Sequence, residues 1–445
     1  MTCRFADGWL CLAEHVYGLV ERLYFLLIWS TVVRPMAPMR ISTMSNPIQL
    51  DRSSQGAGLN VGLGGSNEHG CVALSDGQTI LGVCEQERIT RVRGAGFNAT
   101  GLPDEALDLL LGRAGRSRRD ILRYTVAEDT GRAPLQNSAR MDHHQAHAGA
   151  SYLSSGFTSA VIVVCDNEFP DVSVWQGNGS DLTRIDWPWQ GQGFSDLYYR
   201  CAHLLVFGAA AEQRFEALAR LDPDHRDDRL DSQLKTDGVS LHLEAGWEQR
   251  VSDWFLAETS QPGIGKRARQ AAALQRRVGE LLLTFLVKVR AATHSENLCL
   301  AGSLFYHSSI NSIVKTSGLF ARVFVPVNPG NAGLAVGTAL YASGCLPRRL
   351  SPFLGPAYTS GEIKATLENC KVDYTWVSET EAVEIAVDAL RRGRLVGWYD
   401  GAMEWGPRAL GARSILANPF APYVLENLNQ FLKNRDPWCG YALSG

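Results

Sequence analysis

A predicted β-strand at 323–327 leads into a glycine-rich turn at 328–333 and then into an Ala-rich helix, and this order constrains the possible fold strongly. Another predicted strand, Leu298–Ala301, follows a long amphipathic helix at 268–290, and the β-branched run Ala160–Val164 ends just before Asp166. Strands that alternate with helices in this way are typical of an α/β protein. A glycine turn between a strand and a helix N-terminus is also the ordinary scaffold for holding phosphate or ribose.

The chain is long enough, at 445 residues with 45% hydrophobic content, for two or three domains that each bury a core. Apolar runs around an Asp-Gly turn predict antiparallel hairpins from residue 59 to 83, and helical spacing follows at 102–111. A Pro-rich link at 346–356 precedes a capping box predicted at Ser378 and Glu381. We expect three parts: a poorly ordered N-terminal extension at 1–58, a first domain at 59–356 and a second at 357–445.

Composition excludes several classes of protein. A net charge of −3 without a long basic run argues against nucleic-acid binding. Ten scattered cysteines without a CxxC pair argue against a disulfide framework and a zinc ribbon, and favour a reducing cytoplasm. The apolar run Leu23–Val33 is shorter than the roughly 20 residues that span a bilayer, so we expect no stable membrane span.

The sharpest local signal is a pair of histidines four residues apart, His143 and His147. On a helix their side chains point the same way, as two metal ligands must. Asp166, after the buried strand, is the candidate third ligand, and this set suits iron, manganese or zinc. Histidine pairs also cap helices or fill cores, so spacing alone leaves both interpretations open. His144 points away from the shared face, which favours a structural role.

Glycine turns and a basic segment are the candidate sites for a nucleotide. Glycine permits a close backbone approach to a ligand, although single turns of this kind are common. Guanidinium groups bind phosphate bidentately, although a charged segment is often only a solvated face. The candidates are Gly302 and Ser303 with His307 and Asn311 behind them, then Gly330, Asn331 and Gly333, and finally Glu404, Arg408, Arg413, Ser414, Lys433 and Arg435.

In this order, the segments resemble the carbamoyltransferase family that includes the rhizobial nodulation carbamoyltransferases and antibiotic-tailoring relatives. His143–Ala148 with Ser155–Phe157 is similar to the family's HHxAHA…SGF segment. Met403–Leu416 is similar to its long MEWGPRALGxRSIL segment. The resemblance extends from Asn60 to Gly445.

The resemblance implies an α/β fold with an actin-like, sugar-kinase-superfamily domain followed by a truncated YrdC-like domain. In the family, the second domain joins carbamoyl phosphate to ATP, which releases pyrophosphate and gives a carbamoyl-adenylate, and the first domain transfers the carbamoyl group to a hydroxyl. The implied cofactors are ATP and a divalent metal, expected to be Fe(II), held by His143, His147 and Asp166. The expected acceptor is a small molecule or oligosaccharide, with a lipo-chitooligosaccharide nodulation factor as the first candidate.

Deprotonating the acceptor requires a nearby base, for which His69, His143 and His144 are candidates that the sequence does not separate. Asn331 stands where relatives often have aspartate, so we expect a weaker metal site. Relatives continue beyond the Lys433–Asp436 segment, and the alternative hypothesis is therefore a truncated, catalytically silent nucleotide-binding protein. A sugar kinase of the same superfamily is the other alternative.

Overall fold

The computed structural model describes residues 2–4 as backbone, and residues 58–128, 138–167, 170–206, 208, 210–257 and 263–442. The expectation of a poorly ordered extension at 1–58 falls almost wholly outside these residues. The chain divides into two compact units, each described by itself. The larger unit comprises Pro47–Pro356 and Glu404–Arg408, and the smaller unit comprises Met1–Asn46, Ala357–Met403 and Ala409–Gly445.

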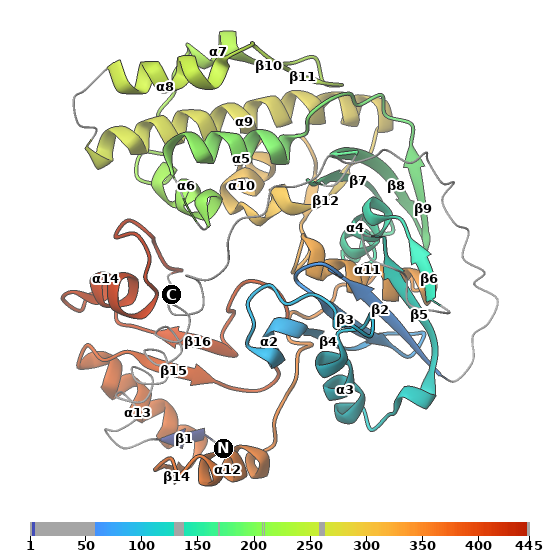
Figure 1. The fold of residues 1–445 in the computed structure, drawn as a ribbon, viewed down its shortest axis with the longest axis vertical. Coiled ribbons are helices and arrows are strands. Elements are labelled where there is room, and N and C mark those ends of the chain that lie inside the picture. The colour runs from blue at the N-terminus through green and yellow to red at the C-terminus, as the bar shows by residue number, and fades with distance from the viewer. Residues whose placement is uncertain are drawn as a thin grey trace. The chain divides into compact units, whose positions relative to one another are not determined.

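The first sheet of the larger unit has five strands in the order β4-β3-β2-β5-β6 (Figure 1). The pairs β2–β3 and β3–β4 are antiparallel, as the hairpin pattern predicted, and β2–β5 and β5–β6 are parallel. Helix α3, Asp104–Arg113, buries Leu107, Leu110 and Leu111, the residues that its spacing places on one face. The strand bounds are Leu59–Gly64 (β2), Cys71–Ser75 (β3), Ile80–Glu85 (β4), Ile121–Ala127 (β5) and Ser138–Met141 (β6).

The second sheet repeats this topology in the order β9-β8-β7-β12-β13. Two antiparallel pairings, β7–β8 and β8–β9, are again followed by two parallel pairings, β7–β12 and β12–β13. This duplicated topology confirms the predicted α/β class. The strand bounds are Ser159–Cys165 (β7), Val172–Asn178 (β8), Asp181–Ile185 (β9), Asn297–Ala301 (β12) and Arg322–Phe324 (β13).

Two helices, α4 (His143–Tyr152) and α11 (Leu334–Ala342), lie between the sheets (Figure 1). They pack backbone to backbone, because a Cβ added to Gly337 of α11 would lie 2.0 Å from the carbonyl oxygen of Ala146. On the other side of α11, a Cβ added to Gly62 of β2 would lie 2.1 Å from the carbonyl oxygen of Ala335. Glycines therefore set the spacing of the layers around α4.

A helical layer packs around the long helix α9, Ile264–Thr293. The apolar face expected of this amphipathic helix is buried, and it includes Ala272, Leu274, Val278, Leu281, Leu282 and Phe285. The predicted strand at 323–327 is shorter than expected and ends at Phe324, since Pro326 has no N–H to donate to a ladder. The neighbouring elements are α5 (Phe194–Leu205), α6 (Ala211–Ala219), α7 (Leu230–Gln233), β10 (Leu234–Thr236), β11 (Leu241–Leu243), α8 (Trp247–Ala257) and α10 (Ser308–Thr316).

The smaller unit has short strands and helices. Ser378 caps α13 by accepting a hydrogen bond from the N–H of Glu381, while the complete capping box lies at Thr359 and Glu362 of α12 rather than at the predicted site. The elements are β1 (Thr2–Arg4) paired with β14 (Thr375–Val377), α12 (Ser360–Asn369), α13 (Glu379–Arg391), β15 (Val396–Tyr399) paired with β16 (Arg413–Leu416), α14 (Val424–Glu426) and the π-helical η4 (Asn427–Leu432). In the described part of the chain, none of the helices has the length and apolar character needed to cross a bilayer.

Candidate metal centre

Helix α4 carries both histidines of the predicted metal site. Its N-terminus is capped by Asp142, whose carboxylate accepts a hydrogen bond of 2.8 Å from the N–H of Gln145. The helical period then places His143 and His147 on one face, one turn apart. Asp166 follows directly after β7, the central strand of the second sheet, so two rigid elements present the three side chains.

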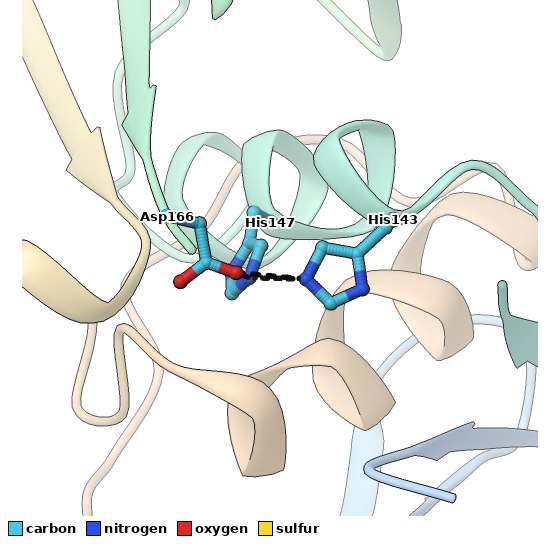
Figure 2. Close-up of side chains that lie close together, drawn as sticks. All are labelled: His143, His147 and Asp166. Carbon is cyan, nitrogen blue, oxygen red and sulfur yellow. Dashed lines mark hydrogen bonds and ion pairs between the residues drawn. The ribbon is translucent and has the colours of Figure 1, made fainter. Parts of the chain in front are cut away.

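The three side chains converge on one point, as Figure 2 shows, and we call them the His–His–Asp triad. The Oδ2 atom of Asp166 lies 2.9 Å from Nε2 of His143 and 3.2 Å from Nε2 of His147. The two Nε2 atoms lie 3.1 Å apart. All three residues are buried, with exposed fractions of 8% or less.

The triad fits a divalent transition metal. Ligand atoms that each lie about 2.1 Å from one ion are about 3 Å apart when they occupy adjacent positions, close to the distances in the triad. The Nδ1 atom of His143 faces the carbonyl oxygen of Glu128 at 3.2 Å, an outer partner that directs the Nε2 lone pair toward the triad. Among the residues that the structure describes, this is the one cluster of three His, Cys, Asp or Glu side chains that meets the geometry of a metal site.

The electrostatics of the triad favour the protonation states that bind metals. Burial by itself would raise the pKa of Asp166, but the two histidines lower it well below its usual range. Burial lowers the pKa of His147, against the opposing effect of Asp166. An ionised carboxylate and a neutral imidazole are the forms that act as ligands.

The first predicted nucleotide turn lies against the triad. The backbone N–H of Ser303 donates a hydrogen bond of 2.8 Å to Oδ1 of Asp166, the oxygen that faces away from the histidines. Gly302 has a φ of 100°, and an added Cβ would lie 2.0 Å from the carbonyl oxygen of Cys165. Only glycine allows the chain to pass this close to the end of β7. Asn311 supports the same turn by donating to the carbonyl oxygen of Phe305.

The second turn, residues 328–333, is organised by a buried side chain that the sequence analysis did not single out. The Oδ1 atom of Asn328 accepts hydrogen bonds from the Tyr306 hydroxyl at 2.5 Å and the Gly330 N–H at 3.2 Å. Its Nδ2 donates to Glu85 at 3.3 Å, although the two residues are 243 positions apart. Asn at the start of a Gly-rich turn was the available signal.

Packing explains the other glycines of this turn. A Cβ added to Gly330 would lie 2.4 Å from the Tyr306 ring, and one added to Gly333 would lie 2.0 Å from the carbonyl oxygen of Asn328. Asn331 begins the short helix η3, Asn331–Gly333, and its backbone oxygen faces Gly64 of the first sheet. The turn therefore lies on the first sheet.

The basic segment predicted to bind phosphate is divided between the two units. Glu404 is buried and Arg408 is exposed, and both belong to the larger unit, where Arg408 donates to the carbonyl oxygen of Tyr306 at 3.3 Å. Trp405 anchors this segment, since its ring is buried in the larger core and its backbone N–H donates to the carbonyl oxygen of Pro352 at 3.0 Å. The N–H of Gly411 donates to the Ser414 hydroxyl at 3.1 Å in the smaller unit.

The remaining basic candidates also belong to the smaller unit. Arg413 lies on β16, opposite Tyr399 of β15. Burial lowers the pKa of Lys433, and the nearby charge of Arg435 lowers it further. The guanidinium of Arg435 also lies over the Tyr441 ring.

The remaining candidate histidines are held in different surroundings. His144 is buried, and its Nδ1 lies 2.6 Å from the hydroxyl of Ser173. The side chain of His69 is 51% exposed and lies 4.0 Å from Glu87. Of the three candidate bases, the structure thus brings His143 alone into the triad.

His307, a predicted nucleotide ligand, lies in a second buried charged cluster. Its Nδ1 lies 3.6 Å from Glu216, its Nε2 lies 3.8 Å from Glu212, and its ring stacks on Tyr198. Glu216 also accepts a hydrogen bond of 2.8 Å from the N–H of Ser309 at the start of α10. These contacts fix the helix that follows the first turn.

This cluster predicts a pH-dependent stability. Burial alone would lower the pKa of His307, but Glu212 and Glu216 raise it, so its stabilising effect is present below about pH 6.5 and lost as the pH rises through the folded pKa. Burial alone would raise the pKa of Glu216, but His307, Ser309 and Arg220 lower it, so its contribution is present above about pH 4.5 and lost on acidification.

Glu216→Gln should therefore lower the Tm most at about pH 5 to 6. The difference in Tm between the variant and wild type should become smaller toward pH 8. Thermal unfolding followed by circular dichroism measures this. Glu248→Gln is the control, because Glu248 pairs with an arginine, Arg200 at 2.6 Å, and not with a histidine. Its Tm difference from wild type should therefore be the same at each pH. If the Tm difference between Glu216→Gln and wild type increases between pH 6 and pH 8, the interaction of Glu216 with His307 is not the source of the pH dependence.

Comparison with known proteins agrees with these observations. The family model described as "Carbamoyltransferase N-terminus" matches residues 127–340, which contain the whole triad and both turns, and "Carbamoyltransferase C-terminus" matches residues 387–444. Nodulation protein NolO of Bradyrhizobium diazoefficiens is 26% identical over 318 residues, 68% of this chain and 58% of its own length. Nodulation protein NolNO of Sinorhizobium fredii is 25% identical over 426 residues, 84% of this chain and 61% of its own length.

The chain thus spans 58% and 61% of the lengths of these two curated relatives. Among solved structures, the activator of the 2-hydroxyisocaproyl-CoA dehydratase from Clostridium difficile, with bound ADPNP, aligns with a TM-score of 0.42 and 14% identity. The alignment covers 72% of this chain and 98% of the activator.

Proposed function

The chain belongs to the carbamoyltransferase family, and from this premise we propose that it transfers a carbamoyl group to a hydroxyl of a small acceptor. The observation that carries the proposal is the convergence of His143, His147 and Asp166 within the residues that the family's N-terminal model matches. A buried, ionised carboxylate beside two imidazoles is a functional-site arrangement rather than an ordinary apolar core.

The proposed donor is a carbamoyl-adenylate. Carbamoyl phosphate, ATP and water would give this adenylate with release of phosphate and pyrophosphate. The glycine turns at Gly302–Ser303 and at residues 328–333 are the proposed nucleotide-binding segments, and Arg408 is the proposed phosphate-binding side chain of the larger unit. Arg413, Ser414, Lys433 and Arg435 of the smaller unit are the proposed residues for adenylate formation.

The triad residues would hold a divalent metal, for which we propose Fe(II). When bound, such an ion supplies a Lewis acid that polarises the carbamoyl carbonyl. His143 and His147 offer Nε2 atoms, and Asp166 offers one carboxylate oxygen, which leaves coordination positions for substrate.

In the proposed transfer, the acceptor oxygen attacks the carbamoyl carbon, the bond from that carbon to the adenylate oxygen breaks, and AMP leaves. The acceptor proton passes to a base. His143 is committed to the triad and His144 to Ser173, so His69, with its exposed ring, is the proposed base.

The proposed acceptor is a lipo-chitooligosaccharide nodulation factor. Its support is the name of the two relatives above, both nodulation proteins. A chitooligosaccharide is therefore the first acceptor to test.

Incubation of the protein with a chitooligosaccharide, ATP, carbamoyl phosphate and ferrous iron should add the mass of one carbamoyl group to the sugar. Mass spectrometry measures the product, and a parallel assay measures pyrophosphate. Reactions without carbamoyl phosphate, and reactions with His147→Ala, are the controls and should give no product.

The other outcomes separate the alternatives. ATP binding without carbamoyl-phosphate-dependent pyrophosphate release, in a folded preparation, would favour a silent nucleotide-binding relative. A phosphorylated sugar would instead identify a kinase. Pyrophosphate release without a carbamoylated sugar would retain the donor chemistry and exclude this acceptor.

A further inference from the structure

The two carboxylate oxygens of Asp166 have different partners. Oδ2 faces the Nε2 atoms of His143 and His147, at 2.9 and 3.2 Å. Oδ1 accepts a hydrogen bond of 2.8 Å from the backbone N–H of Ser303, which lies 137 positions further along the chain. Asp166 is only 3% exposed, so water does not compete freely for either oxygen.

The direction of the Ser303 N–H is fixed by the position of the preceding residue, Gly302. Gly302 passes so close to the end of β7 that an added Cβ would lie 2.0 Å from the carbonyl oxygen of Cys165. The N–H of Gly302 donates to the carbonyl oxygen of Pro329 in the other glycine turn, at 2.8 Å. The Ser303 hydroxyl has a different partner, since it donates a hydrogen bond of 3.4 Å to the hydroxyl of Ser195.

From this geometry we infer that the backbone N–H of Ser303 positions Asp166 for metal binding. The hydrogen bond to Oδ1 stops the carboxylate from rotating about its final bond, so that Oδ2 alone faces both histidines. The group acts through Asp166 and does not itself touch the metal. This inference rests on the metal site of the proposed function.

The physical basis is preorganisation of a ligand by its outer partner. A carboxylate without the N–H would lose orientation entropy on binding an ion, and it could turn both oxygens away from the optimal direction. Removal of such outer partners typically weakens metal affinity about 10-fold to 100-fold. Because one hydrogen bond to an ionised carboxylate is removed, we expect a loss of about tenfold.

The experiment separates the N–H from the hydroxyl. Ser303→Ala removes the hydroxyl and keeps the N–H. In that background, incorporation of lactic acid at position 303 replaces the peptide N–H with an ester oxygen and retains the methyl side chain. Binding of Co²⁺ to the full metal-free chain, followed by visible absorption, reports the ligand field of the triad without any need for turnover.

A matched control lies in the same unit. The N–H of Ser309 donates to the carboxylate of Glu216 at 2.8 Å, the same kind of bond at the same length. The corresponding pair, Ser309→Ala and lactic acid at position 309, should lower the Tm and leave Co²⁺ affinity within about twofold, because neither residue contacts the triad in the described structure.

Support for the inference requires that the ester at position 303 weaken Co²⁺ binding about tenfold relative to Ser303→Ala, while the control ester does not. Equal affinities for Ser303→Ala and its ester would overturn it. A tenfold loss already in Ser303→Ala would assign the effect to the hydroxyl and also overturn it. If wild type binds no Co²⁺, or if His147→Ala leaves the affinity unchanged, the proposed metal site fails first.

Discussion

His147→Ala should abolish metal binding in the larger unit, with a loss of affinity of more than about 100-fold, beyond the range typical of outer partners. The imidazole is fully buried and supplies one of two nitrogen atoms that lie 3.1 Å apart. Alanine provides no ligand atom, and the remaining His143 and Asp166 would form a two-ligand site open to water. Isothermal titration of the metal-free protein with Co²⁺ or Fe(II) under anaerobic conditions measures the loss.

The matched control is His144→Gln on the same helix. His144 is equally buried, but its Nδ1 contacts the hydroxyl of Ser173 rather than the triad. Glutamine retains a polar group there, so we expect metal affinity within about twofold of wild type. Comparable losses in the two variants, with Tm values that show both are folded, would mean that His147 acts through the packing of α4 and not as a ligand.

Gly337→Ala should be strongly destabilising although it adds one methyl group. Its Cβ would lie 2.0 Å from the carbonyl oxygen of Ala146 and 2.7 Å from the backbone N of Ala150, and backbone atoms inside a packed helix cannot move aside separately. The helices α11 and α4 must separate, at a cost of about 3 kcal/mol in the free energy of unfolding. Urea denaturation of the purified chain measures the change.

Gly112→Ala is the control, and it should change the free energy of unfolding in the opposite direction. Gly112 lies near the end of helix α3, and an added Cβ would have no heavy atom within 4 Å. Since glycine lowers helix stability relative to alanine, we expect stabilisation of about 0.5 to 1 kcal/mol. If both variants shift the urea midpoint in the same direction, helix propensity rather than the contact between α4 and α11 dominates.

The spacing of residues along the chain was enough to predict the two histidine ligands of the triad. Spacing placed His143 and His147 on one helical face because the period of the α-helix is fixed by its own backbone hydrogen bonds. Apolar runs around an Asp-Gly turn likewise located β2, β3 and β4. The strand predicted at 323–327 was too long, because a proline near its end removed a donor that the hydrophobic pattern does not register.

Proximity in the sequence does not determine which side chains meet in the folded protein. His307 follows a glycine turn in the sequence, yet its ring lies against Tyr198, Glu212 and Glu216, which come from the preceding helices α5 and α6. Conversely, Asn328 and Glu85 join through a hydrogen bond across 243 positions, and no short motif contains both. Such pairings follow from how separate elements pack.

The sequence by itself determined helices α3 and α9, the hairpin strands β2 to β4, the shared face of the two histidines and the need for glycine in the turns. Each of these follows from backbone geometry within a few residues. Tertiary structure decided that Asp166, 23 residues after His143, brings one carboxylate oxygen within about 3 Å of both imidazoles, and that the N–H of Ser303 donates to the other oxygen. The reason is that α4, β7 and β12 acquire their relative positions only when the duplicated sheets pack around the helices between them.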